Sequence, residues 1–140
     1  MAFTGNFTCN TFKTGLMNGT FNFTSGSFYL ALYTNSASLN EDTTAYTVTG
    51  EASGGNYVAG GNLLTIAQVP TVGNGDTAFI SFNNTSWTGA ITARGALIYL
   101  SGGGNPAVCV LDFGADKTST ATFTVQFPAV TNTSAIIRIS

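Results

Sequence analysis

The feature that most constrains the fold of this chain is a pair of long apolar runs separated by a glycine-rich break. The runs are Ile91–Leu100 and Ala107–Phe113, and residues 101–106 (SGGGNP) lie between them. Glycine and proline interrupt a strand, whereas apolar runs of this length favour one. The stretch Ile91–Gly114 therefore predicts a long β-hairpin.

Neither strand of this hairpin alternates between apolar and polar side chains. The first strand places Leu97 and Tyr99 on one face and Ile98 and Leu100 on the other. A strand with one face in water would carry polar residues on that face. Both faces of the hairpin therefore need cover. We expect it from the second sheet of a sandwich and, on the other side, from loops, from the N-terminal segment or from another subunit.

Further strand-like segments follow one another at short, regular spacing, and helical patterns are nearly absent. Such spacing predicts an all-β protein, a single β-sandwich of jelly-roll-like topology with seven or eight antiparallel strands. The chain of 140 residues has the size of one domain, with the sandwich over residues 27–140 and an N-terminal arm over residues 1–26. Besides the hairpin, the expected strands are Ser27–Thr34, Asn62–Val69, Thr77–Asn83, Thr120–Phe127 and Ser134–Ser140, with an eighth near Thr47–Glu51.

The N-terminal arm is rich in phenylalanine, which must be buried somewhere. Asn10 can cap a short helical turn that ends at Gly19. The arm either packs back over its own sandwich or reaches a neighbouring subunit, because chain ends are free to leave the fold. The interface candidates are the aromatic residues of the arm and of the semi-polar face of Ser27–Thr34, namely Phe3, Phe7, Phe12, Phe21, Phe23, Tyr29 and Tyr33.

Charge is scarce in this sequence. Charged residues make up 7%, the net charge is −2, and the four basic residues are scattered along the chain. Without a basic patch, neither nucleic acid nor an anionic membrane is an expected partner. A surface of hydroxyls and amides can be covered by a neighbour with little desolvation of charge, which favours an assembly role over catalysis.

Catalytic and metal-binding patterns are missing. The chain has no histidine, the commonest general base and zinc ligand. The triple glycine 102–104 is followed by a strand, and Asp112-Phe113-Gly114 stands without the other kinase motifs, so neither indicates a nucleotide site. We expect no catalytic residues, no metal and no cofactor. Paired carboxylates could serve a glycosidase, and the leading acids for that third alternative are Asp112 with Asp116, Glu41 with Asp42, and Asp76, although two acids in one loop are more often solvated or paired with a base.

Two further expectations concern single residues. Arg94 is the one basic residue inside the hairpin, and it can form a structural ion pair with Asp112 if the register sets them opposite each other. Cys109 lies in an apolar strand, so we expect a buried free thiol there rather than a bridge to Cys9. No export signal or membrane-spanning run is recognisable, which predicts synthesis in a cytosol.

Several segments carry a resemblance to a known group of proteins. They are FYLALYTNSASLN, VAGGNLL, ITARGALIYL, AVCVLDFGADKTS and FTVQFPAVTNTSAIIRI, and together they span most of the chain from Asn10 to the end. These segments resemble a widespread group of small virion proteins of tailed bacteriophages. The resemblance implies a non-enzymatic, capsid-associated protein of the head cement or decoration type.

The same resemblance implies the partners and the location. They are the major capsid protein and further copies of this chain in a dimer or trimer, at the capsid surface after synthesis in the host cytoplasm. An alternative of another class is a receptor- or glycan-binding module of a phage fibre, suggested by aromatic residues among Asn and Thr. The residues that suggest it are Trp87, Tyr33, Tyr46 and Tyr57.

Overall fold

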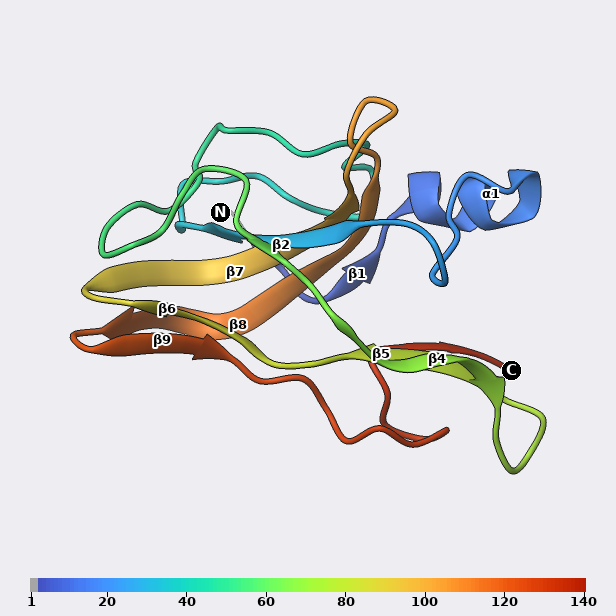
Figure 1. The fold of residues 1–140 in the computed structure, drawn as a ribbon. Coiled ribbons are helices and arrows are strands. Elements are labelled where there is room, and N and C mark those ends of the chain that lie inside the picture. Colours follow the sequence, from blue (N-terminus) through green and yellow to red (C-terminus); the bar gives the residue numbers. More distant parts are fainter. Residues whose placement is uncertain (1–2) are drawn as a thin grey trace.

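A computed structural model describes residues 3–140 and shows two facing layers of antiparallel strands (Figure 1). One layer is a five-stranded sheet in the order β1-β8-β7-β2-β3. The other consists of a three-stranded sheet, β10-β5-β4, and a two-stranded sheet, β6-β9. The prediction of an all-β, sandwich-like fold is confirmed, while the jelly-roll topology stays a prediction. The elements are β1 (Phe7–Thr8), α1 (Asn10–Asn18), β2 (Phe28–Tyr33), β3 (Asn62–Leu63), β4 (Ile66–Val72), β5 (Ala78–Phe82), β6 (Thr85–Thr88), β7 (Ile91–Leu100), β8 (Ala107–Ser119), β9 (Thr122–Val125) and β10 (Ile137–Ile139).

The predicted hairpin is the β7–β8 pair at the centre of the five-stranded sheet. Ile98 lies opposite Cys109, and Leu97 lies opposite Val110. The three glycines at its tip all have positive φ angles, which residues other than glycine adopt only at a cost in energy. The second strand is longer than expected, because β8 resumes pairing after a wide irregularity and continues to Ser119.

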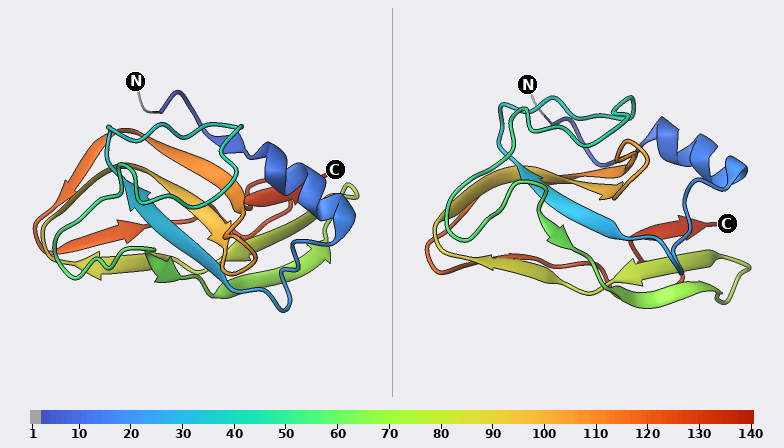
Figure 2. Two further views of the ribbon diagram at one scale, coloured as in Figure 1. Left: turned by 90° about the horizontal axis from the view of Figure 1, so that it is seen from above. Right: turned by 45° about the horizontal axis from the view of Figure 1, so that its top comes forward.

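The central strands β2 and β7 of the five-stranded sheet are buried on both faces over most of their length, as their sequence requires. Phe28 and the other even-numbered residues of β2 face the second layer, where Phe28 lies 6.1 Å from Phe82 between ring centroids. Tyr33 and Ala31 point the other way and are equally buried. Residues 34–61 form long loops over this outer face, and they place Ala37 and Leu39 in the core (Figure 2). The loops of the chain itself therefore supply much of the second cover.

The N-terminal arm, described from Phe3 onward, packs on its own sandwich. Helix α1 ends at Gly19, which has the left-handed φ of 79° expected for a stop. Its N-cap is Cys9 rather than Asn10, and no side chain caps the helix. A Cβ atom on Gly15 would lie 2.3 Å from the ring of Phe21, so a residue that weakens the helix makes room for an aromatic contact.

Three strand predictions need correction. Ten strands form among residues 3–140 rather than seven or eight, since β1 and β6 were not expected and Asn62–Val69 divides into β3 and β4. The segment around Trp87, which lies outside every expected strand, is β6, because Trp87 pairs with Phe123 of β9 and is buried. The expected strand near Thr47–Glu51 amounts to a single bridge between Glu51 and Tyr33.

Within residues 3–140, no helix has the length and apolar character that crossing a membrane requires.

Candidate functional site

The interface candidates of the arm lie mostly inside the molecule. The ring of Phe23 stacks on Phe28 at 4.5 Å, and that of Phe12 meets Phe21 edge-on at 5.0 Å. This corrects the prediction that these residues offer a surface to a neighbour, because the large apolar area of the rings is covered within the chain itself. Five of the seven candidates are buried: Phe3, Phe12, Phe21, Phe23 and Tyr33.

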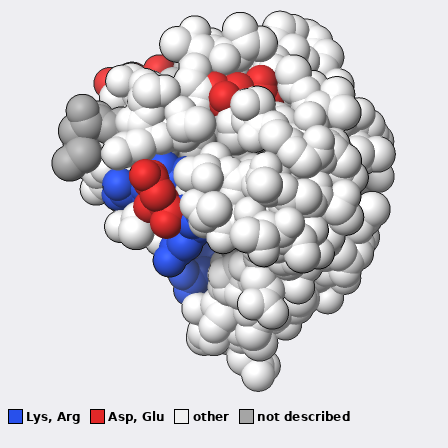
Figure 3. Space-filling model, turned by 90° about the vertical axis from the view of Figure 1, so that its left-hand side faces the viewer, with Lys and Arg blue, Asp and Glu red and all other residues white. Residues whose placement is uncertain are grey.

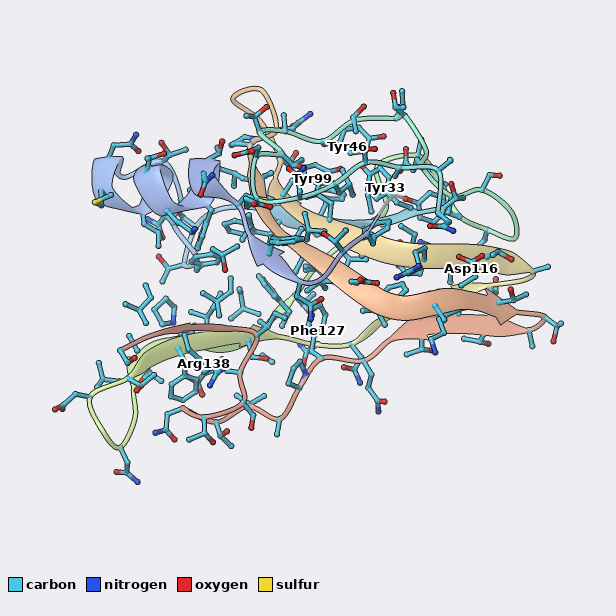
Figure 4. All side chains as sticks on the ribbon, turned by 180° about the vertical axis from the view of Figure 1, so that it is seen from behind. Tyr33, Tyr46, Tyr99, Asp116, Phe127 and Arg138 are labelled. Atoms are coloured by element: carbon cyan, nitrogen blue, oxygen red, sulfur yellow. The ribbon has the colours of Figure 1, made fainter. Side chains whose placement is uncertain are left out.

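The remaining two candidates, Phe7 and Tyr29, are half-buried. Tyr29 stacks on Tyr99 at 5.9 Å, and Tyr99 stacks on Tyr46 of the covering loop at 4.8 Å. The semi-polar face of β2 is thus neither a wetted surface nor a free interface. It is the floor of a tyrosine cluster beneath the loops, where Tyr33, Tyr46 and Tyr99 lie close together (Figure 4).

A single carboxylate, Glu51, organises this cluster. Its Oε1 accepts a hydrogen bond of 2.7 Å from the hydroxyl of Tyr46. Its Oε2 accepts bonds of 2.6 Å from the hydroxyl of Tyr57 and 2.7 Å from the backbone N–H of Gly60. A carboxylate with three donors is well satisfied, so the charge can lie under the loops without a basic partner.

The same network joins the loops to the sheet. The backbone N–H of Leu32 donates to the Tyr57 hydroxyl at 2.9 Å, and the Tyr99 hydroxyl donates to the carbonyl of Gly60 at 2.7 Å. The Tyr33 hydroxyl donates to the carbonyl of Thr47 at 2.7 Å. These three hydrogen bonds attach the loops, at Thr47, Tyr57 and Gly60, to strands β2 and β7. The chemistry of the cluster is therefore structural, since each of these hydroxyls is engaged within the protein.

Burial and the nearby carboxylate raise the pKa of these tyrosines. Burial is the main cause at Tyr99, where the Glu51 charge adds to it and the pKa rises to about 12. The pKa values of Tyr33, Tyr46 and Tyr57 are raised as well, first by burial. At Tyr46 and Tyr57 the hydrogen bond to Glu51 adds to the rise, because a phenolate would lose that bond and face a negative charge.

Arg94 and Asp112 form an ion pair of 3.0 Å between Nε and Oδ1. Gly95, not Arg94, lies opposite Asp112 in the register, and the pair forms across the irregularity between Ala93 and Gly95. Burial raises the pKa of Asp112, but the N–H of Gly114 and the Arg94 guanidinium outweigh it, so the pKa lies below its ordinary value. The ion pair therefore links β7 and β8 where their register is irregular, and its role is structural.

The other acidic residues are dispersed. Asp42 accepts a hydrogen bond of 3.0 Å from the side chain of Asn10, and Asp76 lies exposed at the β4–β5 turn with a positive φ of 60°. Among residues 3–140, no group of three or more acids or cysteines is placed to hold a metal ion.

The two thiols are free and buried. The Sγ of Cys9 lies 3.9 Å from the carbonyl oxygen of Asn40 in the covering loop. Thr8, not Cys9, pairs with Cys109 across β1 and β8, so the adjacent Cys9 side chain points to the opposite face of the sheet. Burial raises the pKa of Cys9 to about 11 and that of Cys109 to about 12, which keeps both protonated at neutral pH.

The aromatic residues that suggested a glycan site are not arranged as a binding platform. Trp87 is only 2% exposed, and Tyr33 is fully buried. Tyr57 lies 5.5 Å from Trp87 between ring centroids, but its hydroxyl is bonded to Glu51. A sugar needs an open aromatic face and free polar groups in one cleft, and these four residues do not provide that arrangement.

Exposed apolar side chains recur along residues 58–72, a stretch that includes β3 and β4, each at the edge of its sheet. We call Val58, Leu63, Val69 and Val72 the β3–β4 edge; between 52% and 71% of each is exposed. No charged residue occurs from position 52 to position 75. The strand β4 carries Pro70 and two register irregularities, features that discourage pairing with a further strand. Contact at this edge would therefore be made by side chains.

The wider surface is also poor in charge. On the face drawn in Figure 3, acidic and basic atoms gather in a few small groups, and the rest is uncharged. The β3–β4 edge and the Glu51 network were both missed from the sequence. A usable signal existed for each: the long charge-free stretch for the edge, and a lone acid between Tyr46 and Tyr57 for the network.

Comparison of the chain with protein-family models, with curated proteins and with solved structures finds no match.

Proposed function

We propose that this chain is a non-enzymatic structural protein of a phage virion, of the cement or decoration type, that binds the outside of the head lattice. The observation that carries the proposal is the β3–β4 edge, a stretch without charged residues that exposes four large apolar side chains. The sequence resemblance described above supports the same class of protein.

The physical argument concerns the cost of covering a surface. Burying a charge without a partner is expensive, whereas hydroxyls, amides and valine side chains are covered at little cost. A protein with few charges can therefore make many weak contacts with neighbours. When one molecule bridges two lattice subunits, the second contact forms at a high effective concentration, and the shell is stabilised by mass action.

The proposal names the partners and the place. They are the major capsid protein and further copies of this chain in a dimer or trimer, at the capsid surface, with synthesis in the host cytoplasm. Because four of the five phenylalanines of the arm are buried and Phe7 is half-buried, the proposed lattice contact lies at the β3–β4 edge instead.

The first experiment tests whether this chain is a component of the phage particle. Mass spectrometry of purified particles of the encoding phage should detect this chain in many copies for each head. Absence from intact particles would end the proposal. Particles made without the chain should lose DNA at lower temperature or lower salt, and added purified protein should restore them.

The second experiment tests the surface. Val69→Asp and Val72→Asp place a charge on the β3–β4 edge and should weaken binding to particles lacking the chain. Thr124→Asp, on an exposed position of β9, is the matched control and should bind as the unaltered protein does. Circular dichroism checks that all three variants are folded. Full binding by both valine variants would show that the lattice contact lies elsewhere.

A further inference from the structure

The two layers of the sandwich separate at the end near α1 and enclose a cleft of about 650 Å³. Its walls come from Thr8 and Cys109 of the five-stranded sheet, from Phe12 and Leu16 of α1, and from β10. Figure 2 shows α1 and the C-terminal strand β10 at this same end of the molecule. A cleft of this size falls within the range of ligand sites in proteins.

A second, more apolar cavity of about 370 Å³ adjoins the cleft. The two share four side chains, Phe12, Leu16, Ile137 and Ile139. The second cavity extends toward Phe79 and Ile80 of β5. Ile139, a residue of both linings, is 55% exposed. The core beneath α1 is thus reached from solvent through a second cavity whose lining is mainly apolar, which favours an apolar occupant there.

Two sheet edges border this opening. β1 is an outermost strand of the five-stranded sheet, and β10 is an outermost strand of the three-stranded sheet. Within residues 3–140, neither pairs with a strand on its outer side. Phe7, Thr8, Ile136 and Arg138 line one further cavity together, so the two edges meet at the same opening. Unpaired strand edges take up extended peptide segments by backbone hydrogen bonds.

The charged side chains that line the cleft are both basic. Lys13 and Arg138, two of the four basic residues of the chain, line it, and none of the Asp or Glu side chains of residues 3–140 does. Both reach neutral oxygens: Lys13 donates to the side-chain oxygen of Asn10 at 3.2 Å, and Arg138 donates to the carbonyl of Thr133. Neither has a carboxylate partner among the described residues. A negatively charged occupant is therefore favoured.

The charge also argues against a second copy pairing through β10. An antiparallel pair that keeps all three residues of β10 in register is centred on Arg138. It would set the two Arg138 side chains directly opposite each other, and like charges at that position are destabilising.

We propose that this cleft binds an extended segment of a different protein, one that adds to the β10 edge and carries apolar side chains around an acidic residue. Its backbone pairs with β10, its apolar side chains enter the cavity between α1 and β5, and its carboxylate binds Lys13 and Arg138. The inference rests on the cleft and holds whether or not the partner is a capsid subunit.

The test uses the full chain and a short acetylated, amidated peptide in which threonine and valine alternate around a central glutamate. The control peptide has lysine in place of the glutamate. Binding is followed by amide resonances in nuclear magnetic resonance spectra. The glutamate peptide should shift the signals of residues 7–8 and 136–139 and slow their hydrogen exchange, and it should bind about tenfold more tightly than the lysine peptide, a difference of about 1.4 kcal/mol.

Variants separate the contributions. K13Q combined with R138Q should remove the preference for glutamate. Ile139→Asp should abolish binding. Val130→Asp makes the same kind of change at an exposed residue outside the cleft lining and should leave binding intact. Equal binding of the two peptides, or no change at residues 136–139, would overturn the proposal. Binding of palmitate in the cleft without binding of the glutamate peptide would also overturn it and identify a lipid site.

Discussion

The five-stranded sheet and the three-stranded sheet of this protein differ in how completely they are covered. β7 is buried on both faces, with Leu97 under the loops and Ile98 toward the other layer, and both are fully buried. β4 alternates between half-buried and exposed residues, and β10 is mostly exposed. The central strands β2 and β7 of the five-stranded sheet are thus interior elements, whereas β4 and β10 are exposed edge strands of the three-stranded sheet. We therefore expect the stability of the domain to depend mainly on the covered central strands, and any interaction to use the exposed edge strands.

The largest expected effect tests whether the loop-covered face is a true core. Leu97→Ala should lower the free energy of unfolding by about 2 to 5 kcal/mol, because it leaves a cavity beneath the loops. Val69 lies in β4 of the three-stranded sheet, and 54% of its side chain is exposed. Val69→Ala should therefore change the free energy of unfolding by less than about 0.5 kcal/mol. Urea unfolding of both variants checks the difference. Similar losses in the two would remove the distinction between the sheets.

The second-largest expected effect tests whether Glu51 holds the loops of residues 34–61 on the five-stranded sheet. Glu51→Ala leaves two tyrosine hydroxyls and one N–H without their acceptor, and should cost about 2 to 3 kcal/mol. Glu51→Gln retains one carbonyl oxygen and should cost about half as much. Urea unfolding and hydrogen exchange at Gly60 are the measurements. If Glu51→Ala unfolds like the unaltered protein and Gly60 keeps its protection, the carboxylate does not fix the loops.

A third prediction uses alkaline pH. Folding raises the pKa of Tyr33, Tyr46, Tyr57 and Tyr99 above the ordinary value of 10.0. The unfolded chain therefore loses these protons first, so the stabilisation is fully present below about pH 10 and is lost as the pH rises through the folded values. Near-ultraviolet titration should show these tyrosines ionising late and together with unfolding. Ionisation near pH 10 in a chain that stays folded would contradict the covered arrangement.

The smallest expected effect concerns Asp112, the second carboxylate after Glu51 that is held by hydrogen bonds within the protein. The folded pKa of Asp112 lies below its ordinary value of 3.8, so its stabilisation is present above that pH and lost as the pH falls through the folded value. Asp112→Asn should cost up to about 1 kcal/mol at neutral pH, as is usual for partly exposed pairs. Unfolding of the variant and of the unaltered protein should converge in strong acid. If the two free energies of unfolding differ by the same amount at all pH values, the loss of stability comes from changed packing and not from the ion pair.

Much of the covered sheet was predictable. The long apolar runs gave the β7–β8 hairpin, and Gly19 gave the end of α1. The position of Trp87 was not predictable, because its neighbours are Asn, Thr, Ser and Gly, which favour turns. It lies in a strand because burial against Phe123 outweighs those local preferences.

The candidate surfaces were less predictable than the fold. Dense phenylalanines in the arm suggested an interface, but an aromatic-rich segment has the same composition whether it covers its own core or that of a neighbour. The open cleft at β10 involves residues from both ends of the chain, Thr8 and Arg138, whose proximity no local pattern encodes.

The sequence by itself determined that the central hairpin needs cover on both faces, because the alternation of side chains along a strand is a local property. Only the tertiary structure decided what supplies that cover. Residues 34–61 and the arm reach the outer face through contacts between segments far apart in the chain, and the Glu51 network holds the loops there. Such contacts depend on how the whole chain closes on itself, so they follow from packing and not from periodicity.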